Sequence, residues 1–321
     1  MYYGMVARYH KAWKEGQEPL KHAYRLSMES ADTQFGLISP VLSILNLLVA
    51  GGPIAGSAQA MKSVYQVLYQ KNQDILMRIL RPFFQYTLNI LGTNPKVNPI
   101  DLTGAIMNLE EDVKFAEITK NHKIMFCILL CRADMAYTLH EFFAAKDYIN
   151  QIHDLAPPSL LEEELIISSL LVHFRFLDAM TAIALLWEGQ YNEEEGIQLM
   201  EQIQSSLDKL HELAQYCPDN IAQKVWMIEG EMMAFEATAP GDMAAAQRVF
   251  QQAIDHCQKH GLIKEQCLAM ERLGLALRVR EKEDDALDML EDACGLYRQY
   301  GALIKVSYAK RVLLCFMLFG F

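Results

Sequence analysis

The feature of this sequence that most constrains its fold is an apolar stripe that recurs along the chain. Four segments alternate small and large apolar residues at spacings of 4, 3 and 4, which keeps them on one face of an α-helix. In chain order the copies are Ala145, Ile149, Ile152 and Ala156; Gly196, Met200, Ile203 and Leu207; Ala246, Phe250, Ala253 and Cys257; and Ala286, Leu290, Ala293 and Tyr297. One such helix cannot bury its stripe alone, so the copies predict stacked helical repeats.

Each stripe follows a second helical segment that has a small residue between two other apolar residues. The central small residues are Ala133, Ala184, Gly230 and Gly274. Two antiparallel helices approach closely only where one side chain is small, and large neighbours then fill the grooves on either side. The pattern therefore predicts helix hairpins, in repeats of 40 to 51 residues.

Helical periodicity extends over nearly the whole chain. It predicts helices near residues 5–28, 38–50, 56–91, 109–119, 122–138, 140–154, 160–189, 193–215, 219–237, 243–260, 263–281, 283–299 and 302–318. Capping pairs mark the starts at Ser159 with Glu162 and Asn192 with Glu195, and Gly261 and Gly301 mark ends. We expect an all-α superhelical solenoid of antiparallel helix hairpins over residues 1–321. Residues 1–120 form divergent N-terminal helices, and residues 121–321 form the recognisable repeats.

The repeated pattern resembles the tetratricopeptide repeat. Its first helix has a small residue between two bulky ones, as at Gly274, and its second helix has alanine, a large apolar residue and alanine, as at Ala286, Leu290 and Ala293. The repeats here are longer than the usual length of about 34 residues and lack the closing proline.

The last third of the chain resembles the helical region of large multidomain signalling ATPases and, more distantly, the superhelix of maltose-regulator-type transcription activators. The residues that carry the resemblance are Gly261, Glu265, Ala269, Glu271, Tyr297, Tyr300, Gly301, Ala302, Lys305 and Val306. The first family implies a non-catalytic coupling scaffold, which relays between ATPase or kinase-like modules and histidine-kinase or nucleotide-cyclase output modules. The second leaves an alternative, a solenoid that senses a small-molecule effector in its concave groove. The apolar end, residues 312–321, favours a segment of a larger protein.

The net charge of −11 is unevenly spread. Residues 1–100 carry ten Lys and Arg against five Asp and Glu, whereas residues 101–321 carry nineteen against thirty-five. An acidic body repels phosphate backbones, so we expect no nucleic-acid partner. The scattered basic side chains, Arg78 and Arg81 among them, are interpreted as a solvated helix face. The partner we expect is a protein, or a neighbouring domain, with a basic surface.

The seven cysteines are an odd number without a Cys-x-x-Cys pair, which favours reduced, buried thiols in a cytoplasmic protein. Cys127 and Cys131 lie in an apolar helical run and are expected in the core. The chain start lacks the apolar core of a signal peptide. The most apolar stretch, residues 37–50, is too short to span a bilayer, so we expect no membrane role.

Three patterns that imitate functional sites have simpler interpretations. Residues 51–57 imitate a phosphate loop but lack its lysine, so a turn is expected. His256 and His260 could share a zinc ion with Cys257 or Cys267, but Cys257 belongs to an apolar stripe. Acidic clusters such as residues 110–112 fall in first helical turns, where they offset the helix dipole. We therefore expect no enzyme, no cofactor and no metal, and the sequence assigns no binding residues.

Overall fold

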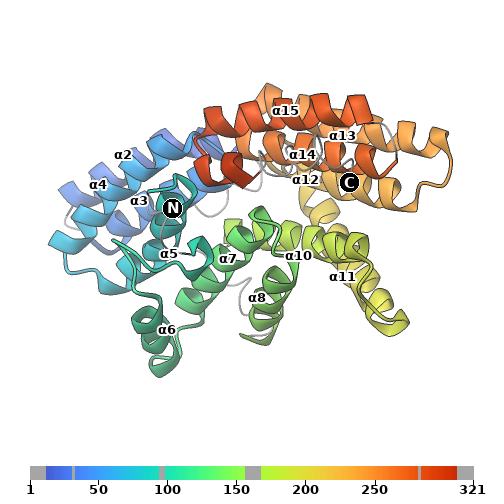
Figure 1. Ribbon diagram of the computed structural model, residues 1–321. Helices are drawn as coiled ribbons and strands as arrows, with labels where there is room; N and C mark the ends of the chain where they lie inside the picture. Colours follow the sequence, from blue (N-terminus) through green and yellow to red (C-terminus); the bar gives the residue numbers. More distant parts are fainter. Residues whose placement is uncertain (1–11, 31–32, 94–97, 156–167, 281–282, 309–321) are drawn as a thin grey trace. The chain divides into compact units, whose positions relative to one another are not determined.

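The structure is a computed structural model that describes residues 12–30, 33–93, 98–155, 168–280 and 283–308. Within these ranges all regular structure is helical (Figure 1). The helices are η2 (Trp13–Gly16), α2 (Gln17–Glu29), α3 (Thr33–Val49), α4 (Ile54–Gln70), α5 (Asp74–Ile90), η3 (Pro99–Asp101), α6 (Leu109–Ile118), α7 (His122–Thr138), α8 (Phe142–Leu155), α10 (Ser168–Glu188), α11 (Glu193–Ala214), α12 (Pro218–Glu236), α13 (Pro240–His260), α14 (Ile263–Val279) and α15 (Glu283–Tyr300), followed by helical residues 303–308.

Neighbouring helices pack in pairs along the chain. The closest pairs are α2 with α3, α7 with α8, α12 with α13, and α14 with α15. The prediction of an all-α fold built from paired helices is therefore confirmed. The first helices of the last two pairs, α12 and α14, also touch each other directly.

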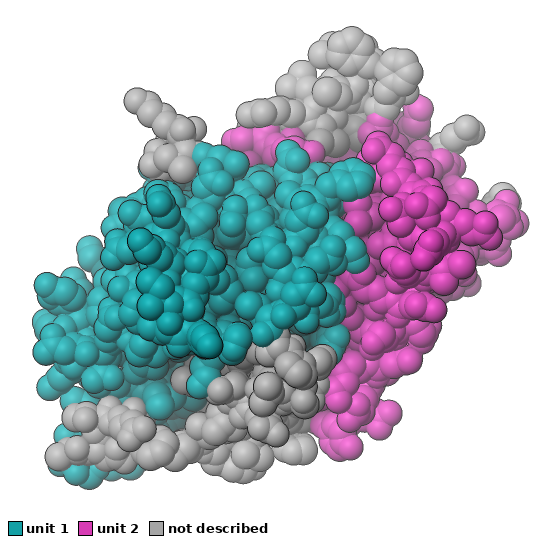
Figure 2. Space-filling model, turned by 90° about the horizontal axis from the view of Figure 1, so that it is seen from below, with its two compact units in different colours: residues 1–50, 54–177 teal, residues 51–53, 178–321 magenta. Residues whose placement is uncertain are grey.

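The chain divides into two compact units, which are coloured separately in Figure 2. The first unit comprises residues 1–50 and 54–177, and the second comprises residues 51–53 and 178–321. This division lies inside α10, whereas the sequence pattern becomes recognisable at residue 121. The two positions differ because a compact unit is defined by contacts, which helices can make without the repeated pattern.

Small residues interlock with large ones inside the last two hairpins, as the stripes predict. A Cβ atom at Gly230 would lie 3.0 Å from the ring of Phe250, and one at Gly274 would lie 2.7 Å from Cγ of Leu290. Ala246, Phe250, Ala253 and Cys257, and likewise Ala286, Leu290, Ala293 and Tyr297, are buried. The paired helices are thus so close at Gly230 and Gly274 that the space admits the glycine hydrogen atom but not a methyl group.

The stripe predicted for α11 is wrong in register. Met200 is 39% exposed, and the buried residues of this helix are Leu199, Ile203, Ser206 and Leu210. These four also have spacings of 4, 3 and 4. The error arose because α11 carries apolar residues around a wide arc, so two overlapping stripes fit the same pattern. In α8, Ala145, Ile149 and Ile152 are buried as predicted, and Ala156 lies outside the described residues.

Three predicted helices have different bounds in the structure. The helix expected over residues 5–28 is described from residue 12, where the 3-10 helix η2 precedes α2, so the α-helix begins only at Gln17. The helix expected over residues 56–91 is broken into α4 and α5, because Asn72 adopts a left-handed conformation with φ of 54°. The helix expected from residue 38 begins at Thr33 and continues through Pro40. Burial of Leu37 and Val41 on either side of Pro40 compensates for the backbone hydrogen bond that proline cannot make.

The helix caps agree with the sequence where the structure describes them. The Asn192 side chain accepts from the amide of Glu195, and the Glu195 carboxylate accepts from the amide of Asn192, each at 2.9 Å. Gly261 and Gly301 have φ of 72° and 95°, the left-handed conformation of a helix terminator. The expected cap at Ser159 and Glu162 lies outside the described residues.

Candidate functional site

The most distinctive polar features of the described residues are two networks of buried charges, one in each compact unit. Ionised groups are seldom buried unless they are paired, because removal from water carries a large desolvation cost. Each network joins three or more helical segments.

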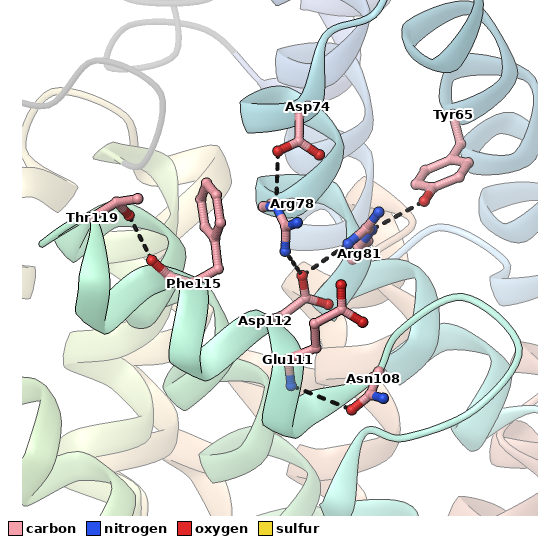
Figure 3. A network of polar contacts seen from close by, with 9 residues as sticks. All are labelled: Tyr65, Asp74, Arg78, Arg81, Asn108, Glu111, Asp112, Phe115 and Thr119. Atoms are coloured by element: carbon pink, nitrogen blue, oxygen red, sulfur yellow. Dashed lines mark hydrogen bonds and ion pairs between the residues drawn. The ribbon is translucent and has the colours of Figure 1, made fainter.

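The first network centres on Asp112, in the first turns of α6 (Figure 3). Arg78 and Arg81 extend from α5 and converge on the same oxygen, Asp112 Oδ1, at 2.5 and 2.8 Å. Arg78 Nε also donates to Asp74 at 2.9 Å, and Arg81 Nε donates to the hydroxyl of Tyr65 on α4 at 3.0 Å. One carboxylate thus ties α6 to α5, and through Arg81 to α4.

The electrostatics of this network favour a structural tie. Burial disfavours the charge of Arg81, but its bond to Tyr65 and its proximity to Asp112 raise its pKa above the ordinary value. The guanidinium of Arg78 lies 3.9 Å from the ring centroid of Phe115, a cation–π contact that adds a second link to α6. The other oxygen of Asp112 is buried without a hydrogen-bond partner.

This geometry corrects two interpretations from the sequence. Arg78 and Arg81 do not form a solvated face, because their side chains are only 12% and 18% exposed and both are paired. Asp112 is not merely part of an acidic first turn, since it is buried and holds both arginines. A sequence signal exists in the spacing of the two arginines, which places them on one face of a helix.

The second network joins the first helices of successive hairpins in residues 178–308. Lys224 Nζ on α12 lies 2.7 Å from Glu265 Oε1 on α14. Glu231 on α12 pairs with Arg272 on α14 through both of its oxygens. The next step along the chain is an ion pair of 2.7 Å between Glu271 of α14 and Lys305, in the helical residues 303–308.

Aromatic side chains complete the same network. Trp187 Nε1 on α10 donates to Glu231 Oε2 at 3.1 Å, which extends the series back to α10. The Tyr297 hydroxyl donates to Glu271 Oε2 at 2.8 Å. We call this set the charge ladder; its members are Trp187, Lys224, Glu231, Glu265, Glu271, Arg272, Tyr297 and Lys305.

The ionised groups of the charge ladder are all buried, and three cations match three carboxylates. Burial lowers the pKa of Lys305, although the nearby Glu271 carboxylate opposes that shift. The charges of the three pairs cancel, although Glu265 Oε2 is buried without a hydrogen-bond partner. The ladder can therefore fix the position of one helix against the next, which is a mechanical task.

Half of the ladder coincides with the residues that carry the family resemblance, namely Glu265, Glu271, Tyr297 and Lys305. Sequence analysis missed Lys224, Glu231 and Arg272. A signal for them is a charged residue placed inside an apolar helical pattern, as with Glu231 directly after Gly230. Their pairing is not visible in the sequence, because the partners lie 41 residues apart.

The candidate metal ligands do not assemble. His256 and His260 stack with ring centroids 4.3 Å apart, and His256 also contacts Trp226. Burial lowers the pKa of His256. The backbone carbonyl of Asp219 opposes this shift, and the nearby His260 adds to it. Across the described ranges no group of three or more His, Cys, Asp or Glu side chains is placed to hold a metal ion.

The remaining sequence candidates have structural positions. Gly51 forms a turn with φ of 65° between α3 and α4. Cys127 and Cys131 are buried in α7, and burial raises the pKa of the Cys127 thiol. One helical stretch, Ser169–Glu188, is long and apolar enough to cross a membrane, but most of it is buried inside the protein, as in the core helix of a globular fold.

No protein-family model matches this chain, and no curated protein shows significant sequence similarity to it.

Proposed function

We propose that this protein is a non-catalytic scaffold of helical repeats that couples neighbouring modules or protein partners in cytoplasmic signal transduction. The observation that carries the proposal is the charge ladder, which links α10, α12, α14 and residues 303–308 in series. A coupling segment needs such serial contacts, because a displacement at one end must bias the positions of helices further along.

The energetics of buried ion pairs suit this role. A pair in a low-dielectric interior loses several kcal/mol when one partner is removed, so the geometry between helices is strongly preferred. Tight pairing at Gly230 and Gly274 makes each hairpin a firm body. Firm bodies joined by directional contacts transmit displacement better than a loosely packed bundle does.

Three further observations favour signalling and a protein partner. The resemblance to the helical region of signalling ATPases involves four members of the ladder, which suggests a relay between ATPase or kinase-like modules and output modules. The acidic excess of residues 101–321 favours a partner with a basic surface. The six cysteines in the described ranges are buried and form no disulfide bond, which suits a reducing compartment such as the cytoplasm.

The test is to isolate the natural product and its partners. An antibody against residues 241–300 would be used on mildly cross-linked source cells, with blotting and quantitative mass spectrometry. We expect a product well above 36.6 kDa that carries further modules, or a product near 36.6 kDa with a stoichiometric protein partner. A product near 36.6 kDa that remains alone after cross-linking refutes the scaffold.

The physical basis of coupling can be tested separately by hydrogen exchange. Replacing Glu231 with Gln should raise amide exchange in α14 as well as in α12, because the Arg272 charge loses its counter-ion. Glu236→Gln is the matched control, since Glu236 lies on the same helix and is exposed. Equal exchange profiles in the two variants would contradict transmission through the ladder.

A further inference from the structure

One side of α11 presents apolar side chains that lie outside the buried stripe of this helix. Ile197 is 55% exposed, Met200 is 39% exposed, and Leu207 is half-buried. A helix turns by about 100° per residue, so these three lie within one arc that also contains Glu193 and Glu201. We call these five residues the exposed face of α11, the helix that carries this label in Figure 1.

Packing of the repeat does not require this face to be apolar. The buried stripe of α11 is Leu199, Ile203, Ser206 and Leu210, on another side of the helix. Ile197 and Met200 lie two residues before and one residue after the first stripe residue. The equivalent positions in α13, relative to Ala246, are Ala244 and Gln247. The repeat therefore does not require large apolar side chains at both positions: α13 has neither, and in α8 the position of Ile197 is taken by Phe143, which is 52% exposed.

Tyr191 enlarges the apolar area. Its ring lies against Gly196 at the start of α11, where a Cβ atom would be only 3.0 Å away, and the residue remains 37% exposed. An apolar surface of this kind, bordered by polar groups, is typical of an interaction site. Tyrosine and methionine are also frequent at the centres of protein interfaces.

The charge on this face is negative and has no side-chain counter-ion among the described residues. Glu193 and Glu201 are exposed and make no ion pair with any residue that the structure describes. The lysine of this helix, Lys209, pairs with Glu212 at 3.0 Å near the other end. A partner with Lys or Arg beside its apolar residues would supply the missing opposite charge.

We propose that the exposed face of α11 docks a basic amphipathic helix of a partner protein. The partner helix would cover Ile197, Met200 and Leu207 with apolar residues at helical spacing, and would place Lys or Arg against Glu193 and Glu201. The inference rests on the proposed function, because it names where a scaffold would bind and the chemistry of what it binds.

The experiment uses the full chain and two labelled peptides of about five helical turns. One peptide is an amphipathic helix of Leu and Lys, and its twin has Glu in place of Lys. Fluorescence anisotropy should show saturable binding of the Leu/Lys peptide that weakens with salt, and no binding of the Leu/Glu peptide. Saturable binding of the acidic twin with equal affinity overturns the proposal.

Two pairs of variants locate the binding. Ile197→Asp combined with Met200→Asp should weaken binding by about tenfold or more, whereas Val279→Asp, at a residue 57% exposed in α14, should not. Glu193→Gln with Glu201→Gln should weaken binding and flatten its salt dependence. Glu283→Gln with Asp284→Asn, in the acidic first turn of α15, should leave the affinity and its salt dependence unchanged.

The outcomes separate this proposal from the scaffold itself. Equal loss in the α11 and α15 charge variants would mean non-specific attraction to an acidic protein and would overturn the docking face. Self-association of the chain that disappears in the Ile197 and Met200 variant would assign the face to a second copy and also overturn it. If the peptide fails to bind while cross-linking still recovers a stoichiometric partner, the docking proposal is refuted and the scaffold proposal is retained.

Discussion

Replacing Gly274 with alanine tests whether close helix approach holds the last hairpin together. In an ordinary helix interior, alanine in place of glycine is favourable by about 0.5–1 kcal/mol. At Gly274 the new Cβ atom would lie 2.7 Å from Leu290 Cγ and 3.3 Å from the carbonyl oxygen of Ala286. Backbone cannot move aside easily, so overpacking should cost about 1–3 kcal/mol.

Gly295→Ala is the matched control. Gly295 lies inside α15, and an added Cβ atom there meets nothing within 4 Å. The propensity gain is the same in both variants, so the difference between their free energies of unfolding isolates the steric effect. We expect Gly295→Ala to stabilise the protein and Gly274→Ala to be less stable than Gly295→Ala by about 1–3 kcal/mol.

The assay is urea unfolding followed by far-ultraviolet circular dichroism. A double-mutant cycle with Leu290→Ala adds a second criterion, because removing the Leu290 methyl groups should relieve the clash with alanine at residue 274. The double variant should therefore be more stable than the sum of the single effects predicts, by at least about 0.5 kcal/mol. Equal stability changes at Gly274 and Gly295, or strict additivity with Leu290→Ala, would refute the interlocking argument.

Three other variants or conditions have definite expected results. Asp112→Asn should lower the free energy of unfolding by about 1–3 kcal/mol, because two arginines lose their shared counter-ion. Asp74→Asn is the control: its side chain is 55% exposed, so in the same urea titration it should cost less than about 1 kcal/mol. Glu231→Ala should cost about 3–5 kcal/mol by leaving Arg272 buried and unpaired, and a midpoint of urea unfolding that matches the wild type would contradict the pairing. Because burial raises the pKa of the Cys257 and Cys267 thiols, the unfolded chain releases these protons first, so stability should fall as pH rises through about 9. Cys257→Ala with Cys267→Ala should flatten that fall, and a thiol reagent should label both cysteines only after unfolding.

Local patterns in the sequence were sufficient for most helices and for the interlocking glycines. The stripe that begins at Ala246 is long, strictly spaced and bounded by caps, so one register satisfies it. The stripe in α11 failed because its apolar arc is broad, and only contacts with other helices decide which half is buried. The break at Asn72 was missed because asparagine is compatible with both a helix and a left-handed turn.

The buried charges could not be predicted from local patterns. Whether Arg81 faces solvent or Asp112 depends on where α6 packs, and Asp112 is 31 residues further along the chain. Lysine side chains are usually exposed to solvent, so the sequence alone favours an exposed Lys224, whereas in the structure Lys224 is buried. A charge acquires its role from a distant partner, and the sequence contains both partners without indicating that they meet.

The charge ladder also restricts how this protein can change in length during evolution. Repeat arrays of near-identical units can gain or lose a unit and remain stable, because every joint is alike. In this protein each contact between successive hairpins has its own ion pairs. Lys224 requires Glu265, Glu231 requires Arg272, and Glu271 requires Lys305. Deleting the α14–α15 hairpin would leave Lys224 in an apolar joint without a carboxylate. The hairpins of this protein are therefore not interchangeable. We expect homologous chains to keep the same number of these hairpins in the same order.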